Sequence, residues 1–164
     1  MKAVNPEVLR IAQNVTKEMI STGALAAVMM GSHVRGEAHA NSDIDLTFIG
    51  RDGESWLERR ANHLVSVYWR SAETIAKEFS VPAIAGGLVP AWRRAFIIHD
   101  PDGIASQLKR QAETWNWDSI DKQCDIYVSE EISAFAEEIH RLVGSLKSGN
   151  MLMAAIVRSV LAIA

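Results

Sequence analysis

Two apolar stretches on either side of a glycine-serine turn constrain the fold of this chain more than any other feature. Residues 25–30, LAAVMM, are typical of a buried strand, and residues 43–49, DIDLTFI, alternate acidic and apolar side chains before becoming continuously apolar. Such alternation indicates a strand with one solvent-facing side and one buried side. Because side chains two positions apart on a strand share a face, we expect Asp43 and Asp45 to point the same way.

The acidic pair and the turn together predict a site for a cation and a phosphate. Neighbouring carboxylates repel each other unless a cation lies between them, so Asp43 and Asp45 are the expected ligands of a hard divalent ion such as Mg²⁺. Gly31 and Ser32 follow the first strand, where a helix is expected to begin, and a helix N-terminus with a glycine and a serine hydroxyl favours phosphate binding. Arg35, one helical turn later, could reach the same anion.

The segment from residue 31 to residue 50 resembles the signature of the DNA polymerase beta-like nucleotidyltransferase superfamily, in its small bacterial branch. That branch includes aminoglycoside and lincosamide nucleotidyltransferases and the minimal nucleotidyltransferase antitoxins. The Gly-Ser, spacer, Asp-x-Asp pattern is carried here by Gly31, Ser32, Arg35-Gly36, Ser42, Asp43 and Asp45. The resemblance implies an α/β (α+β) nucleotidyltransferase fold, a small mixed sheet flanked by helices, with a helical C-terminal region.

The resemblance also implies an activity. A protein of this kind would transfer a nucleoside monophosphate, AMP from ATP as the first expectation, with Mg²⁺ to a hydroxyl of a small molecule or protein. It implies nucleotide binding by Gly31, Ser32, Arg35 and Ser42, and it implies metal binding and catalysis by Asp43 and Asp45. The alternatives are an antitoxin-like or regulatory domain and a nucleotide-binding protein without turnover. The sequence identifies neither the acceptor nor the base of the nucleotide.

Family members usually carry a third carboxylate on the strand that follows the Asp-x-Asp strand. The strand expected at residues 63–69 contains neither Asp nor Glu, and Ser66 or Tyr68 stands where the carboxylate is expected. A serine can neither neutralise a metal nor act as a base near pH 7. Glu73 and His63 are weaker substitutes. One alternative is that the base comes from the C-terminal helices, whose acidic candidates are Glu130, Glu131, Glu137 and Glu138. The other is that the site binds a nucleotide without transferring it.

Residues 1–117 are expected to form the nucleotidyltransferase domain and residues 118–164 a helical region. The last segment, from Met151, contains Arg158 as its one charge and ends in a run of apolar residues. Because an exposed apolar helix needs a partner, either a second copy or another protein covers it, or the natural polypeptide continues beyond Ala164. We favour the last interpretation.

Helix-capping residues and helix-breaking residues predict the remaining helices and loops. Asn5 and Pro6 predict the start of a first helix, and Asp102 is expected to cap a later one. The pair Gly86-Gly87 and two prolines predict a mobile loop. The expected ranges are short helices at 54–62 and 71–79, the loop at 81–90, a strand at 94–99 and a helix at 104–117.

Composition argues against several classes of function. A net charge of -3 over 164 residues provides no broad basic surface for nucleic acid. The single Cys124 excludes an intramolecular disulfide and fits a reducing cytosol, so a cytoplasmic location is expected. No apolar run reaches the roughly 18 residues of a membrane span, and the N-terminus lacks the apolar core of a signal peptide.

Overall fold

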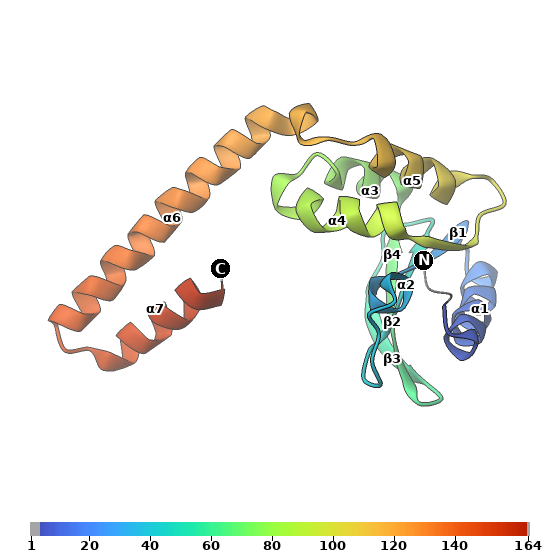
Figure 1. Cartoon of the computed structure of the whole chain (residues 1–164), viewed down its shortest axis with the longest axis horizontal. Coiled ribbons are helices and arrows are strands. Elements are labelled where there is room, and N and C mark those ends of the chain that lie inside the picture. The colour runs from blue at the N-terminus through green and yellow to red at the C-terminus, as the bar shows by residue number, and fades with distance from the viewer. Residues whose placement is uncertain (1–3, 164) are drawn as a thin grey trace. The chain divides into compact units, whose positions relative to one another are not determined.

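The computed structural model describes residues 4–163, which divide into two compact units, with the boundary in the chain between Ser119 and Ile120. The first unit holds a mixed sheet with helices packed on it, and the second holds two long helices (Figure 1). The elements are α1 (Pro6–Ser21), β1 (Ala26–Met30), α2 (Gly31–Arg35), β2 (Ile44–Ile49), β3 (Trp56–Arg60), β4 (His63–Arg70), α3 (Ala72–Glu78), α4 (Pro82–Arg94), β5 (Phe96–His99), α5 (Ile104–Thr114), a 3-10 turn (Trp117–Ile120), α6 (Asp121–Lys147) and α7 (Met151–Ile163).

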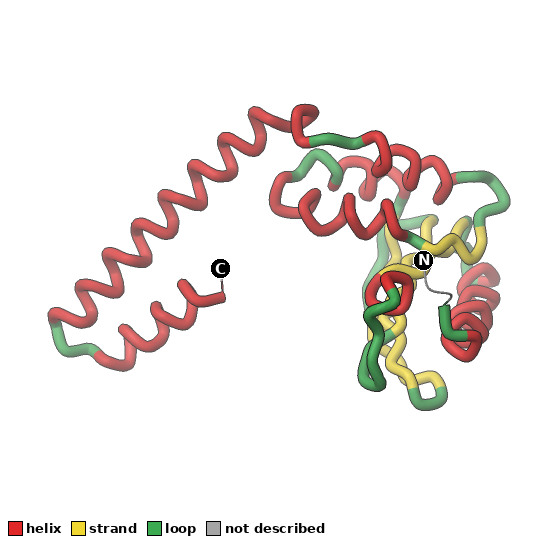
Figure 2. The backbone as a smooth tube through the Cα atoms, viewed as in Figure 1, coloured by secondary structure: helices red, strands yellow, loops and turns green. Residues whose placement is uncertain are grey.

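The sheet has five strands in the order β3-β4-β2-β1-β5. Figure 2 shows the strands in yellow and the helices in red. β2 and β4 are parallel, whereas the other neighbouring strands are antiparallel. One face packs on α1 through a core that includes Val15 of the helix and Leu46 and Val67 of the sheet. The opposite face contacts α4 and α5 through β1. The expected small mixed sheet flanked by helices is therefore confirmed.

The first helix begins as its sequence predicts. Asn5 Oδ1 accepts a hydrogen bond from the backbone N–H of Glu7 at 2.8 Å, and Pro6 occupies the first helical position. A proline is tolerated there because its missing N–H has no partner within the helix in any case. α1 then buries Val8 and Val15 against the sheet, so this helix is scaffold for the strands that carry the acidic pair.

Residues 54–62 were expected to be helical, and that prediction was wrong. Trp56–Arg60 form β3, an edge strand joined to β4 by a turn in which Ala61 has a φ of +52°. Trp56 and Leu57, expected to face inward, are 38% and 58% exposed. Pairing with β4 makes this segment a strand. The Arg60 guanidinium also binds Glu58 of the same strand at 2.8 Å and Glu18 of α1 at 2.6 Å.

Residues 81–90 were expected to be a mobile loop, but Val81 directly precedes α4 and residues 82–90 lie within it. Pro82 occupies the first turn of the helix, where it costs no hydrogen bond. The second proline, Pro90, lies inside the helix and is exposed. Ala85, Val89 and Trp92 share one buried side of α4, and this burial outweighs the low helix propensity of the glycines.

Asp100, rather than the expected Asp102, binds the first turn of α5. Its carboxylate accepts hydrogen bonds from the backbone N–H groups of Ala105 at 3.0 Å and Ser106 at 2.8 Å, and from Ser106 Oγ at 2.7 Å. Burial raises the pKa of Asp100, but these hydrogen bonds outweigh burial and hold the pKa below its ordinary value. The helix ends at Thr114, three residues before the expected end at 117.

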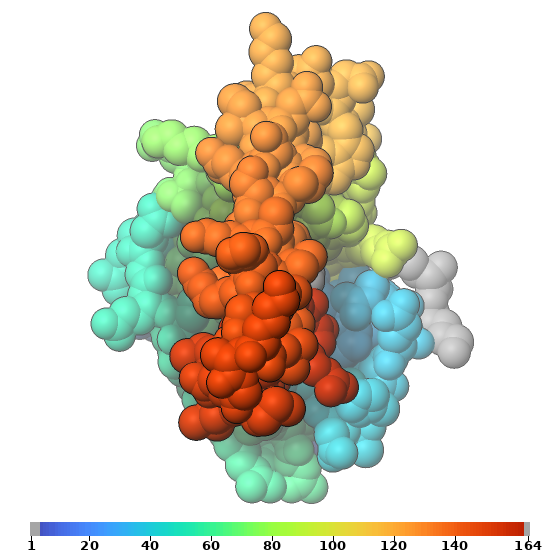
Figure 3. All heavy atoms as spheres, turned by 90° about the vertical axis from the view of Figure 1, so that its left-hand side faces the viewer, coloured from blue at the N-terminus to red at the C-terminus, as the bar shows by residue number. Residues whose placement is uncertain are grey.

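The second unit consists of α6 and α7 and their connecting turn. The two helices, coloured orange to red in Figure 3, pack together. Ser145, Ala154 and Val157 are buried. Several large apolar side chains remain exposed on them, among them Ile132 and Leu152. In residues 4–163, no helix combines the length and the apolar character that crossing a membrane requires.

Candidate functional site

The structure brings Asp43 and Asp45 together at the start of β2. Ser66 of β4 lies in register with Asp45, and its Oγ donates a hydrogen bond to Asp43 Oδ2 at 2.7 Å. Burial raises the pKa of Asp45, and the nearby charge of Asp43 raises it further, while Arg35 and His33 oppose these effects. When the charge of one carboxylate raises the pKa of its neighbour, a cation bound between the two is favoured.

Gly31 lies against the Asp45 carboxylate. The register of β1 and β2 pairs Met30 with Asp45, and α2 begins at the next residue. The φ of Gly31 is +74°, and a Cβ added there would lie only 1.9 Å from Asp45 Oδ2. The expected turn is therefore directly opposite the acidic pair, and a glycine is required for that approach.

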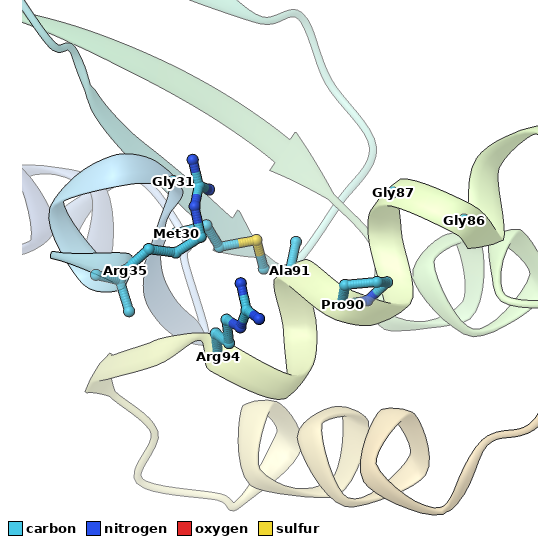
Figure 4. A pocket seen from close by; sticks show the side chains of 9 residues that line it. Met30, Gly31, Arg35, Gly86, Gly87, Pro90, Ala91 and Arg94 are labelled. Atoms are coloured by element: carbon cyan, nitrogen blue, oxygen red, sulfur yellow. The ribbon is translucent and has the colours of Figure 1, made fainter. Parts of the chain in front are cut away.

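A cavity of about 250 Å³ opens beside this turn. Arg35 of α2 and Arg94 of α4 point into the same space from opposite walls (Figure 4). Arg35 Nε is 2.7 Å from Glu37 Oε2. The pKa of Glu37 is lowered by the hydrogen bond and the charge of Arg35, and also by the charge of Arg94. Two guanidinium groups in the lining of one cavity favour an anionic ligand.

The two serines of the predicted site have other surroundings. Ser32 is half-buried in α2, and its carbonyl accepts the backbone N–H of Glu37 at 3.0 Å. Ser42 Oγ accepts the backbone N–H of His39 at 3.0 Å, which shapes the loop before β2. Neither serine lines the cavity with Arg94. Nucleotide binding by Ser32 and Ser42 stays a prediction.

Ser66, rather than Tyr68, is the residue beside the acidic pair on β4. Tyr68 lies two residues further along β4, in register with Thr47 of β2. Glu73 is an exposed residue of α3 whose carboxylate binds Lys77 at 2.8 Å. Among residues 4–163, no group of three or more His, Cys, Asp or Glu side chains is arranged to hold a metal ion. Within the described part of the chain, Asp43 and Asp45 are the carboxylates that lie together here.

Arg94 is the site residue that the sequence analysis did not identify. It was assigned to a strand at 94–99 but is the last residue of α4. Its neighbour Arg93 has a structural role, because its guanidinium donates to the carbonyls of Ala112 at 2.8 Å and Trp115 at 2.6 Å. The helical spacing of Ala85, Val89 and Trp92 was the available signal that this segment is a helix.

Comparison with known proteins identifies the family and the fold of this chain. The family model described as nucleotidyltransferase domain matches residues 10–147, which include all the predicted site residues. A crystal structure of a nucleotidyltransferase-like protein from Exiguobacterium sibiricum 255-15 superposes with a TM-score of 0.54 and 14% sequence identity. The match covers 91% of this chain and 52% of that chain, so this chain spans about half the length of that protein. At this identity the likeness shows a shared fold. No curated protein matches the sequence significantly.

Proposed function

This chain belongs to the nucleotidyltransferase domain family, and from that premise we propose that it transfers a nucleoside monophosphate to a hydroxyl of a small molecule or protein. AMP from ATP is the first candidate, with Mg²⁺ as the cofactor. The observation that carries the proposal is the contact of Asp45 with Gly31, which joins an acidic pair to a cavity with two arginines. One part is suited to a cation and the other to a polyphosphate.

The chemistry of the donor set fits Mg²⁺. Asp43 and Asp45 offer hard oxygen ligands, and the raised pKa of Asp45 reflects burial and a repulsion that a cation would relieve. Magnesium sites with one or two protein carboxylates are normally completed by water and substrate phosphates. When bound, the ion would neutralise negative charge on the reacting phosphate oxygens.

The side chains of this site have separate roles in the proposal. Arg35 and Arg94 bind the β- and γ-phosphates and stabilise the negative charge of the departing pyrophosphate. Gly31 lets the turn approach the acidic pair without a clash. Ser66 holds the Asp43 carboxylate through one oxygen and leaves the other free for the cation. Catalysis would therefore depend mainly on positioning and electrostatic stabilisation.

The experiment that tests the proposal is label transfer from α-labelled ATP. The chain is incubated with Mg²⁺ and panels of hydroxyl compounds and proteins, and labelled products are separated from ATP. Metal-dependent labelling of an acceptor, abolished by a chelator, is the expected result. Absence of labelling with every nucleoside triphosphate and acceptor, in a folded protein, would contradict an enzymatic role.

Arg94→Gln is expected to lower kcat/KM for the nucleotide by roughly 10- to 100-fold, mainly through KM. A hydrogen bond to a charged group contributes about 1.5–3 kcal/mol, and the variant removes the charge that meets the phosphates. Arg110→Gln, at an exposed position of α5, is the matched control. Steady-state kinetics with varied MgATP provide the measurement. Equal kinetics in the two variants would show that Arg94 does not bind the nucleotide.

Asp45→Asn is expected to raise the Tm of the metal-free protein at pH 7. The pKa of Asp45 is raised above its ordinary value of 3.8 in the folded state, so the unfolded state releases this proton more readily. Stability therefore falls as the pH rises from 3.8 through the raised pKa, and the benefit of the substitution disappears below pH 3.8.

Scanning calorimetry with a chelator, across this pH range, measures the effect of Asp45→Asn. Asp102→Asn, in an exposed turn, should follow the wild-type profile. Adding Mg²⁺ should raise the Tm of the wild type more than that of Asp45→Asn, because the ion binds the folded state through this carboxylate. A variant less stable than the wild type at neutral pH would contradict the proposed repulsion.

A nucleotide-binding regulator is the second candidate function, and Ser66 favours it. The serine occupies the position in register with Asp45 where a third carboxylate is expected in the family. An antitoxin-like or regulatory domain needs binding at the two carboxylates and arginines but no base. Calorimetry that detects Mg²⁺-dependent ATP binding, together with no label transfer to any acceptor, would support this candidate over the enzyme.

A further inference from the structure

A second cavity, of about 320 Å³, lies on the face of the sheet that carries Asp45. Thr47 of β2 and Tyr68 of β4 line it, and they are paired in register just as Asp45 and Ser66 are. Each lies two residues beyond its site neighbour on the same face of the sheet, a distance of about 7 Å along a strand. Met30 lines both this cavity and the cavity that contains Arg35 and Arg94, so the two are neighbours.

The lining of this second cavity is mainly apolar with one ion pair. Ile84, Leu88 and Trp92 follow one another at helical spacing along α4 and form an apolar wall. Arg70 Nη1 lies 3.1 Å from Glu78 Oε1, and the Glu78 side chain is only 16% exposed. The pair carries no net charge but presents donors and acceptor oxygens side by side. Such a lining suits an uncharged ring whose edge has both donors and acceptors, as a nucleobase does.

We propose that this second cavity binds the nucleoside of the nucleoside triphosphate, an assignment that rests on the proposed function. The nucleoside is covalently joined to the phosphate that reacts at Asp43 and Asp45, so it must lie beside the polyphosphate cavity. An acceptor hydroxyl instead approaches opposite the departing pyrophosphate. A cavity that shares Met30 with the polyphosphate site fits the first requirement better. Its volume is at the small end for ligand pockets, which suits a single nucleoside.

Ile84→Trp tests the assignment. Ile84 lines the cavity and is 39% exposed, so an indole there would occupy the space without replacing a buried side chain. Ala83→Trp, at the adjacent exposed position of α4, is the matched control. Isothermal titration calorimetry in Mg²⁺ compares two probes, α,β-methylene ATP, which cannot transfer its nucleotidyl group, and inorganic tripolyphosphate, which lacks the nucleoside.

The wild type and Ala83→Trp are expected to bind the ATP analogue at least about tenfold more tightly than tripolyphosphate, since even modest burial of a ring corresponds to that factor. In Ile84→Trp the advantage should disappear while tripolyphosphate affinity stays unchanged. Glu78→Gln, which replaces an acceptor oxygen with a donor amide, should change the relative affinity for the methylene analogues of ATP and GTP. Together these results would assign the nucleoside to this cavity.

Three outcomes would overturn the assignment while leaving the transferase proposal in place. In the first, the wild type transfers label yet binds both probes equally. In the second, folded Ile84→Trp keeps its preference for the ATP analogue, or loses affinity for both probes alike. In the third, Ile84→Trp and Glu78→Gln change only the KM of the acceptor, which would assign the cavity to the acceptor. A wild type that binds neither probe would instead contradict the proposed function itself.

Discussion

Asp43→Asn is expected to reduce transfer of labelled AMP by about a thousandfold or more while leaving the fold intact. The carboxylate is only half-buried and shares one oxygen with Ser66 Oγ, so an isosteric amide is tolerated in the structure. The amide cannot supply the negative charge that holds a divalent cation beside the reacting phosphate. Stabilisation of that charge by a metal amounts to several kcal/mol, and each 1.4 kcal/mol or so corresponds to a factor of ten in rate.

The measurement is the initial rate of label transfer from α-labelled ATP at saturating Mg²⁺, with circular dichroism and Tm as checks of folding. Asp45→Asn should give a loss of similar size. Asp102→Asn, which changes an exposed carboxylate in a turn, should transfer at the wild-type rate. Transfer that survives in both Asp43→Asn and Asp45→Asn would remove the acidic pair from the mechanism.

Local sequence patterns predicted the strands that are buried along most of their length. The alternation at residues 43–49 and the apolar run at 25–30 both became central strands, because each buries one or both faces in the sheet. β3 was missed because it is an edge strand whose charged residues are satisfied by partners distant in sequence, such as Glu18 with Arg60. No short window contains that information.

α4 was missed for a related reason. Pro82, the glycine pair and Pro90 are all helix breakers in isolation, and they led to the prediction of a loop. In the folded protein Pro82 begins the helix, and burial of Ala85, Val89 and Trp92 stabilises the rest. Together these buried side chains outweigh the intrinsic cost of the breakers, which is about 1 kcal/mol for a glycine and about 3 kcal/mol for a proline inside a helix.

The candidate site likewise contains some residues that are close in sequence and others that only the topology brings together. Asp43, Asp45 and Gly31 lie within fifteen residues of one another, and their association follows from one strand, one turn and one antiparallel pairing. Arg94 is far away in sequence and reaches the cavity only because α4 lies beside α2. Ser66 depends on the parallel pairing of β2 with β4, which fixes it opposite Asp45. Such contacts require knowledge of the topology.

Gly31→Ala is expected to reduce transfer by at least about a hundredfold, through a clash and not through loss of a chemical group. The added Cβ would lie 1.9 Å from Asp45 Oδ2, so the carboxylate must rotate away or the turn must shift. Displacement of a catalytic group by about 1 Å commonly costs a factor of this size. The φ of +74° adds backbone strain of about 1–2 kcal/mol, which lowers stability as well.

Gly103→Ala separates strain from the clash. Gly103 has the same φ of +74°, but nothing lies within 4 Å of an added Cβ. It should therefore lower the Tm by a similar amount and leave transfer close to the wild-type rate. Rates of label transfer and Tm values of the two variants provide the measurement. If Gly31→Ala and Gly103→Ala lose activity only in proportion to their lost stability, the close approach of the turn to Asp45 has no role in transfer.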